Sequence, residues 1–337
     1  SDGIYIGGSE VEGLERDVAD YCGVEFAVAL NSGTDALIFA LTSLGIRKGD
    51  EVITPPNSFI ATLAAINHVG ATPVFVDVKN DQNIDPALIE SKITKKTRAI
   101  LPVHLTGRVA DMVAIQEIAG NYNLEIIEDA AQAIGASLYG SRAGSFGGVG
   151  CFSTHPLKNL NACGDGGLLV TNREEIAQFV RGARNHGLEN RNISKNFGTV
   201  SRMDALQAVI LRHRLKRLRE VIDMRRANAR HYMDLLNPDS VFFPPELDGE
   251  FHTYHTFVVQ VQKREELKSF LSKHQIETAI HYPIPLHLQP ASKKFGFKKG
   301  DFPVCEAQAN EILTLPIHQF LKTCQVEKVA RTVNSFF

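Results

Sequence analysis

The sequence of 337 residues has no tryptophan and only five cysteines, and these small numbers already exclude some classes of protein. The cysteines are odd in number, widely spaced and never arranged as Cys-x-x-Cys. That usage is typical of reduced thiols and argues against a disulfide framework or a cysteine zinc site. The twelve histidines show no His-Glu-x-x-His pattern, so we expect no metal site.

Neither an excess of one charge nor a long apolar run is present. The 36 lysines and arginines are balanced by 38 acidic residues, giving a net charge of −2 and no basic surplus for nucleic acid. The apolar runs fall short of the ~20 residues that a membrane-spanning helix requires. The first eight residues carry neither the basic nor the apolar region of a signal peptide. We therefore expect a soluble cytoplasmic protein without a nucleic-acid or membrane partner.

A composition of 44% hydrophobic and 22% charged residues is typical of a globular chain, and the length suggests two domains. From residue 26 to about 172, short apolar runs alternate with helix-length segments. This alternation predicts an α/β domain with a mainly parallel seven-stranded sheet flanked by helices. The expected strands are residues 26–30, 51–54, 73–78, 98–103, 125–128, 149–153 and 168–171. The expected helices between them are residues 34–44, 59–69, 86–93 and 112–121.

Residues 201–236 lack glycine and proline and predict one long helix that ends the large domain, residues 1–236. Its cluster of arginines is interpreted as a solvated or subunit-facing surface. Residues 237–337 predict a smaller C-terminal α+β domain. Its expected elements are strands 256–261 and 277–281 and helices 264–274 and 325–335.

The common nucleotide-binding motifs are missing. The sequence has no Gly-x-Gly-x-x-Gly after a strand and no Gly-x-x-x-x-Gly-Lys-Ser/Thr. The glycine-rich stretch 144–150 precedes a strand instead of a helix, which is the wrong order for binding a pyrophosphate.

Three other features point to chemistry. Asn31-Ser-Gly-Thr34 lies between a strand and a helix, where free N–H groups bind anions, although it also suits an ordinary helix cap. Asp129 follows a buried strand and is expected at the carboxyl edge of the sheet, unless it merely caps a helix. Lys158 lies between Leu157 and Leu160, which is unusual for a solvated lysine. Pyridoxal 5′-phosphate (PLP) chemistry requires this set of an anion site, a carboxylate and a Schiff-base lysine.

With these residues, the chain resembles the DegT-type sugar aminotransferases, a branch of the fold-type-I PLP enzymes. The resemblance extends over nearly the whole chain. The matching motifs are Asn31-Ser-Gly-Thr34, Phe59-Ile-Ala-Thr62, Pro102-Val-His104, Glu128-Asp-Ala-Ala-Gln132, Phe152-Ser-x-His-Pro-x-Lys158-Asn, Gly164-Asp-Gly-Gly167, Arg184-Asn-His-Gly187, Ser201-Arg-Met203 and His281-Tyr-Pro283.

The resemblance implies a role for each matched residue. Lys158 is the catalytic lysine, which forms the internal aldimine with PLP and is released when pyridoxamine phosphate forms during turnover. The implied cofactor contacts are Asp129 at the ring nitrogen, Gln132 at the phenolic oxygen, Phe59 stacked on the ring, and Gly33, Thr34 and Ser153 at the phosphate. The expected substrate contacts are His155, His186, His281, Tyr282 and His287. Val200 stands where the family usually has an asparagine that reaches the partner subunit's phosphate site, and Asn196 or Ser201 could replace it.

The implied function is transfer of an amino group from L-glutamate to a keto-sugar, most simply a nucleotide-linked one, in amino-sugar biosynthesis. The resemblance also implies a homodimer with active sites at the subunit interface. Two alternatives are a PLP-dependent sugar dehydratase of the same fold, whose deoxygenating members have histidine in place of the lysine, and a PLP-binding regulator without turnover. The motifs do not identify the sugar or the carbon that is aminated.

Overall fold

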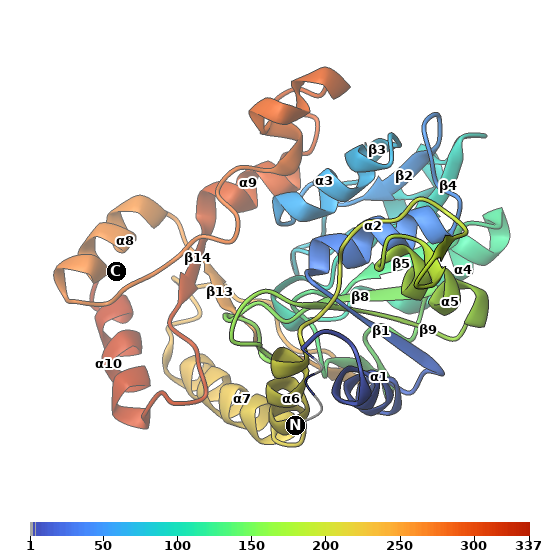
Figure 1. Cartoon of the computed structure of the whole chain (residues 1–337). Coiled ribbons are helices and arrows are strands. Elements are labelled where there is room, and N and C mark those ends of the chain that lie inside the picture. Colours follow the sequence, from blue (N-terminus) through green and yellow to red (C-terminus); the bar gives the residue numbers. More distant parts are fainter. Residues whose placement is uncertain (1–2, 4) are drawn as a thin grey trace.

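The computed structural model describes residue 3 and residues 5–337, and a seven-stranded sheet forms its centre (Figure 1). The strand order is β1-β9-β8-β5-β4-β2-β3. Strand β9 runs antiparallel to β1 and β8, and the other neighbouring pairs are parallel. The predicted mainly parallel seven-stranded sheet is therefore confirmed. Its strands are β1 (Phe26–Leu30), β2 (Glu51–Thr54), β3 (Thr72–Phe75), β4 (Thr97–Ile100), β5 (Glu125–Asp129), β8 (Val149–Ser153) and β9 (Gly167–Thr171).

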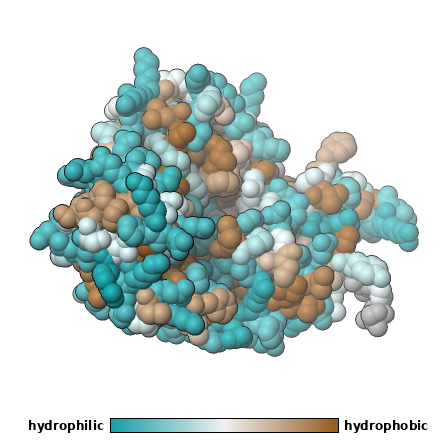
Figure 2. All heavy atoms as spheres, turned by 90° about the vertical axis from the view of Figure 1, so that its left-hand side faces the viewer, coloured by the Kyte–Doolittle hydropathy of each residue, from teal (hydrophilic) through white to brown (hydrophobic). Residues whose placement is uncertain are grey.

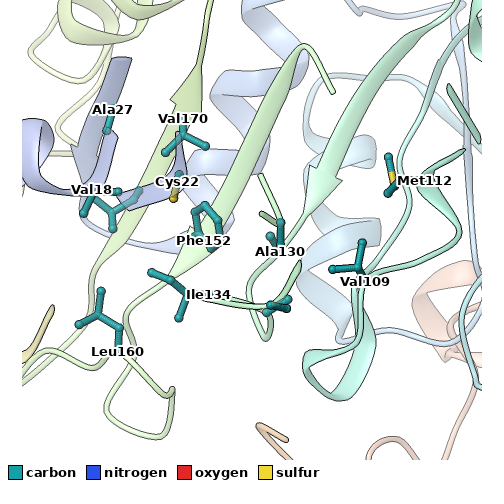
Figure 3. Packing of buried hydrophobic residues seen from close by; sticks show 14 of the residues in the cluster. Val18, Cys22, Ala27, Val109, Met112, Ala130, Ile134, Phe152, Leu160 and Val170 are labelled. Atoms are coloured by element: carbon teal, nitrogen blue, oxygen red, sulfur yellow. The ribbon is translucent and has the colours of Figure 1, made fainter. Parts of the chain in front are cut away.

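Helices cover both faces of the sheet because successive strand residues point to opposite sides. On β1, Ala27 and Ala29 pack in one core cluster with helices α1, α4 and α6, whereas Val28 and Leu30 pack in another with α2, α3 and α5. Figure 3 shows the first cluster, in which Phe152 lies near Cys22, Val170 and Ile134. The helices are α1 (Ser9–Cys22), α2 (Gly33–Ser43), α3 (Ile60–His68), α4 (Met112–Tyr122), α5 (Glu174–Ala183) and α6 (Ala205–Leu215).

The single helix expected over residues 201–236 is wrong, because the chain forms two helices with a break at Lys216 and Arg217. The second helix is α7 (Leu218–Leu235). Leu218 and Ile222 at its start pack in the core of the large domain, whereas Tyr232 packs in the core of the small domain. The break lets α6 pack on α1 while α7 turns towards α10. The domain boundary expected after residue 236 stays a prediction, and α7 contributes to both cores.

The helix expected over residues 86–93 is also not continuous. It consists of two short 3-10 helices, η1 (Pro86–Leu88) and η2 (Glu90–Lys92). Ile89 between them is fully buried, which fixes the chain to the core at the junction.

The small domain contains β13 (Phe257–Gln260) paired antiparallel with β14 (Ile312–Leu315), and it lies away from the main sheet in Figure 1. Its helices are α8 (Arg264–Lys273), α9 (Pro303–Glu311) and α10 (Thr323–Asn334). The strand expected at residues 277–281 is reduced to one bridge between Ala279 and Thr314. Beyond it the chain leaves for the large domain, where Leu286 N–H donates to the Pro56 carbonyl at 2.8 Å.

Short elements complete the described chain. They are η3 (Leu105–Gly107), η4 (Leu286–Leu288), η5 (Pro290–Phe295), β6 (Ser137–Leu138), β7 (Ser141–Arg142), β10 (Leu188–Asn190), β11 (Ile193–Ser194) and β12 (Glu250–Phe251). Among the described residues, no helix combines the length and the apolar character needed to cross a bilayer. The face in Figure 2 is largely hydrophilic, with apolar residues in separate patches.

Candidate active site

Lys158 lies in the turn that follows β8. Burial lowers the pKa of its amine to about 8, and the nearby Asp129 carboxylate opposes this shift. Leu157 does not supply the burial, since it is 75% exposed, whereas Leu160 is fully buried. Asn159 fixes the turn to the small domain by donating from Nδ2 to the Thr253 carbonyl at 3.2 Å. A lysine of lowered pKa is a nucleophile near neutral pH.

Asp129 ends β5 at the carboxyl edge of the sheet, as predicted, and is 4% exposed. Burial raises the pKa of its carboxyl, and two hydrogen bonds oppose this effect. Thr62 Oγ1 donates to Oδ2 at 2.7 Å, and the Ala131 N–H donates to Oδ1 at 3.2 Å. Ser58 in turn lies 2.6 Å from the Thr62 hydroxyl. The position and charge of Asp129 therefore depend on α3, which carries Thr62.

Gln132 joins the Asp129 turn to the small domain. Its Oε1 accepts from the Thr106 N–H at 2.7 Å, and its Nε2 donates to the Tyr282 hydroxyl at 3.1 Å. The Tyr282 ring centroid lies 5.7 Å from that of Phe59. Phe59 is 54% exposed, so part of its ring is open to a bound group. The structure thus places Phe59, Gln132 and Tyr282 together.

The start of α2 lies next to Ser153. Ser32 caps the helix by accepting from the Asp35 N–H at 3.1 Å. The first intrahelical bond runs from Ala36 N to Ser32 O, so the N–H groups of Gly33 and Thr34 precede it. A Cβ at Gly33 would lie 2.9 Å from Ser153 Cβ, so only glycine allows this approach. The helix start, Ser153, Asp129 and Lys158 fit the phosphate, ring nitrogen and aldehyde of PLP.

Four of the five predicted substrate residues have exposed or partly exposed side chains. His155 is exposed on the Lys158 turn, and His186 is exposed with a φ of 61°. His281 lies beside the Tyr282 ring and its Nδ1 is 2.9 Å from Thr314 Oγ1. Of these residues, Tyr282 is the one hydrogen-bonded to Gln132. The pKa of His281 is lowered, mainly by burial and in addition by the charge of the nearby Lys158.

His287 has a different environment from the other four. It is 2% exposed, and its Nε2 lies 3.0 Å from Glu306 Oε1. Its ring contacts Phe75 and Phe302 in a small apolar cluster at the edge of the large domain. This placement favours a structural role, and we leave His287 out of the site proposed below.

The glycine-rich stretch 144–150 binds a carboxylate of the chain itself. Gly144, Phe146 and Gly147 donate backbone N–H groups to Glu128 at 2.7, 2.8 and 2.7 Å. His104 Nε2 lies 2.9 Å from the same carboxylate, and its Nδ1 accepts from the Ala110 N–H. Sequence reasoning named Glu128, His104 and Thr62 only as parts of motifs and gave them no role, and it missed Thr106. The adjacent Glu128 and Asp129 were the available signal.

The structure separates the two suggested replacements for the family asparagine. Val200 is 48% exposed. Ser201 is fully buried and its hydroxyl donates to Asn31 Oδ1 at 3.1 Å, so it holds the turn before α2. Asn196 is exposed beside the β10–β11 hairpin. Of the two, Asn196 is therefore the residue on the surface.

A family model described as "DegT/DnrJ/EryC1/StrS aminotransferase family" matches residues 1–334. A "pleiotropic regulatory protein" of Geobacillus stearothermophilus is 42% identical over 99% of this chain and 91% of its own length. A dTDP-3-amino-3,4,6-trideoxy-alpha-D-glucose transaminase of Streptomyces venezuelae is 42% identical over 99% of this chain and 89% of its own length. A UDP-N-acetyl-3-dehydro-alpha-D-glucosamine 3-aminotransferase of Acidithiobacillus ferrooxidans is 43% identical over 98% of this chain and 90% of its own length.

Solved structures agree with these relatives. The structure of Streptomyces venezuelae DesV in complex with a ketimine intermediate has a TM-score of 0.97 and 42% identity, and covers 99% of this chain and 91% of that one. A Bacillus subtilis protein with bound pyridoxamine phosphate has a TM-score of 0.90 and 33% identity, with 98% and 78% covered. The predicted fold type, sugar aminotransferase activity and PLP cofactor are confirmed. With the family model matched over residues 1–334, the chain belongs to the DegT/DnrJ/EryC1/StrS aminotransferase family.

Proposed function

We propose that this protein transfers the amino group of L-glutamate to the carbonyl carbon of a nucleotide-linked keto-sugar in amino-sugar biosynthesis. The observation that carries the proposal is the placement of Lys158, with its pKa lowered to about 8, near the buried Asp129 carboxylate. The five free cysteines support a cytoplasmic location.

The residues present would hold each part of PLP. The N–H groups of Gly33 and Thr34 and the Ser153 hydroxyl would bind the phosphate, while the exposed part of Phe59 would stack on the ring. Gln132 Nε2 would donate to the phenolic oxygen. When bound, PLP supplies the electron sink that makes the donor's Cα–H acidic.

Asp129 and Lys158 perform different proton tasks. An ionised Asp129, stabilised by the Thr62 hydroxyl, would keep a proton on the ring nitrogen. Lys158 would take the proton from the donor's Cα and return it to the cofactor's C4′, which requires a neutral amine. Its lowered pKa supports this role, because about a tenth of the amine is unprotonated at pH 7, far more than at the usual value of 10.5.

His155, His186, His281 and Tyr282 are the proposed contacts to the sugar. The proposal is best supported for Tyr282, whose hydroxyl accepts a hydrogen bond from the Gln132 amide, and for His281, whose pKa is lowered in part by the charge of Lys158. The names of relatives at 42% and 43% identity refer to dTDP-linked and UDP-linked sugars, respectively. The nucleotide is therefore left open in the proposal.

We further propose a homodimer whose interface completes the site. Large apolar side chains are exposed next to the Lys158 turn and on the segment around α6. Leu157 is 75%, Phe197 106% and Leu206 69% exposed. Contact with a second copy of the chain would remove this apolar area from water. In such a dimer Asn196 would be the residue that reaches the partner's phosphate site.

Two alternatives are tested against this proposal. Lys158 itself argues against a dehydratase of the type that has histidine at this position. A PLP-binding regulator is favoured by one relative, which is named a pleiotropic regulatory protein. The Lys158, Asp129 and Gln132 set supports turnover instead.

The experiment is a screen of dTDP- and UDP-linked keto-sugars with L-glutamate, using mass spectrometry to detect the aminated product. L-Glutamate alone should convert the bound cofactor to pyridoxamine phosphate, and one keto-sugar should return it to PLP. Cofactor absorbance that no amino donor changes would favour the regulator. Loss of the sugar's hydroxyl without amination would favour the dehydratase.

A further inference from the structure

The side-chain amide of Gln132 is held in one orientation by the backbone. An amide group can exchange its oxygen and nitrogen positions by rotating, and only its hydrogen-bond partners select one of them. The Thr106 N–H donates to Gln132 Oε1 at 2.7 Å, which leaves the NH₂ group to face Tyr282. The direction of the Thr106 N–H therefore sets the donor that Gln132 presents to the site.

Thr106 adopts a backbone conformation that is unfavourable for threonine. Its φ of 62° and ψ of −3° lie in the left-handed region, which is unfavourable for a β-branched residue. Such a conformation persists only where surrounding contacts hold it. Here the Thr106 hydroxyl donates to the Leu105 carbonyl at 2.6 Å, and the Thr106 carbonyl accepts from the Thr256 N–H at 3.3 Å.

His252 of the small domain supplies the third contact. Its Nδ1 accepts from the Tyr254 N–H at 2.8 Å, so the ring proton lies on Nε2. Nε2 then donates to Thr106 Oγ1 at 3.2 Å. His252 is 6% exposed and stacks on the Tyr254 ring at 3.9 Å, while Arg226 donates to its carbonyl at 2.7 Å. Burial and the nearby arginines hold the pKa of His252 well below its usual value, so this donor pattern persists over the working pH range.

We propose that Thr106 and His252 are positioning residues, which fix the Gln132 amide so that its NH₂ group points at the cofactor's phenolic oxygen. The chain of contacts runs from His252 through Thr106 to Gln132 and ends at Tyr282. It begins in the small domain and ends at the site, so docking of the small domain sets the orientation of a residue of the large domain. This inference rests on the proposed role of Gln132 toward PLP.

The test uses Thr106→Val, which removes the hydroxyl with little change in shape, and Thr106→Ser, which keeps the hydroxyl. Two quantities are measured, the dissociation constant of PLP and the pH midpoint of the bound cofactor's absorbance. Thr106→Val should weaken PLP binding by about 3- to 10-fold, the loss expected for one hydrogen bond, and shift the midpoint as Gln132→Leu does. Thr106→Ser should recover most of both quantities.

A double-variant cycle separates positioning from a general structural effect. In the Gln132→Leu background, Thr106→Val should cause no further change in either quantity. Thr171→Val is the matched control, because Thr171 is also buried and its hydroxyl donates to the Gly148 carbonyl at 2.7 Å, at the opposite end of β9 from Gly167. It should leave PLP affinity and absorbance unchanged.

The failure modes are distinct. The positioning role is overturned by either of two results in a parent that binds PLP and whose spectrum Gln132→Leu alters. In the first, Thr106→Val has no more effect than Thr171→Val, and in the second, its effect adds fully to that of Gln132→Leu. If Thr106→Val does not fold, the comparison of His252→Gln, which keeps a side-chain N–H, with His252→Leu decides between the same outcomes. A parent that does not bind PLP would instead overturn the proposed function.

Discussion

Glu128 and Asp129 are neighbours in the sequence but have opposite tasks. Alternation along β5 directs their side chains to opposite faces of the sheet. Glu128 is fully buried and accepts three backbone N–H groups from residues 144–147, which fixes the chain there. Asp129 accepts one hydroxyl and one N–H and keeps acceptor capacity for the site. The same residue chemistry therefore serves structure at Glu128 and the proposed cofactor site at Asp129.

Lys158 should capture PLP with a pH dependence set by its own pKa. The amine reacts when neutral, so the rate of capture by cofactor-free protein should rise with pH and level off above about 8 instead of near 10.5. Stopped-flow absorbance measures this rate, and borohydride reduction followed by peptide mapping identifies the lysine. Lys158→Ala should bind PLP reversibly without attachment. Attachment at Lys195 or another lysine would refute the site.

Thr62 should control the acid limb of activity. Thr62→Val removes the hydrogen bond to the Asp129 carboxylate, so the pKa of that carboxyl rises further and ionisation needs a higher pH. A hydrogen bond to a charged group contributes about 1.5–3 kcal/mol, so the acid limb of the glutamate half-reaction should move up by about 1–2 pH units. Thr62→Ser should return it. An unshifted profile in Thr62→Val would show that Asp129 does not depend on this bond.

The β1–α2 turn depends on close approach to neighbouring strands. A Cβ at Gly167 would lie 2.2 Å from the Ser32 carbonyl carbon, and one at Gly33 would press on Ser153. Both glycines therefore bring backbone to within contact distance at the proposed phosphate site. The sequence indicated the turn through Asn31-Ser-Gly-Thr34, but only the sheet order puts β9 and β8 beside it.

Gly33→Ala should weaken PLP binding while the protein remains folded. The added methyl group must displace Ser153 at a cost of about 1–3 kcal/mol, although alanine is the better helix former. Gly182→Ala in α5 is the control, because the added Cβ would meet no atom within 4 Å beyond its chain neighbours and the nearby backbone of its own helix. It should raise the free energy of unfolding by about 0.5–1 kcal/mol and leave PLP affinity unchanged. Titration with PLP and thermal unfolding measure the two effects, and equal PLP affinity in both variants would contradict the assignment.

At the scale of the whole molecule, the large and small domains are connected through α7, which packs in the cores of both. They are also connected through residues 279–286, which run from the bridge with Thr314 to the hydrogen bond with Pro56. Asp77 of the large domain accepts from the N–H groups of Val304 and Cys305 at the start of α9, both at 2.9 Å. Asn159 and Gln132 reach the small domain from the site itself. The small domain thus contributes directly to the geometry around Lys158.

The proposed dimer should depend on the exposed apolar residues of α6. Leu206→Arg should give a monomer in light scattering and lose most transamination, because the charge would be buried at the interface. Val113→Arg on α4, where the parent residue is 54% exposed, is the control and should stay dimeric. A monomeric parent with full activity would contradict the proposed dimer.

The sequence by itself determined the sheet and most of its flanking helices, because these depend on local periodicity. Asp129 and Lys158 stood out by their places after strands, whereas Gln132 was named only through the resemblance to the family. Tertiary structure decided the rest. It broke the helix expected over residues 201–236, since α6 packs on α1 whereas α7 packs on α10, and it enclosed His287 among aromatic rings. It also brought Thr62, Thr106 and His252 to the site from three distant segments. Such hydrogen bonds join residues that no local pattern connects, so only the folded chain selects them.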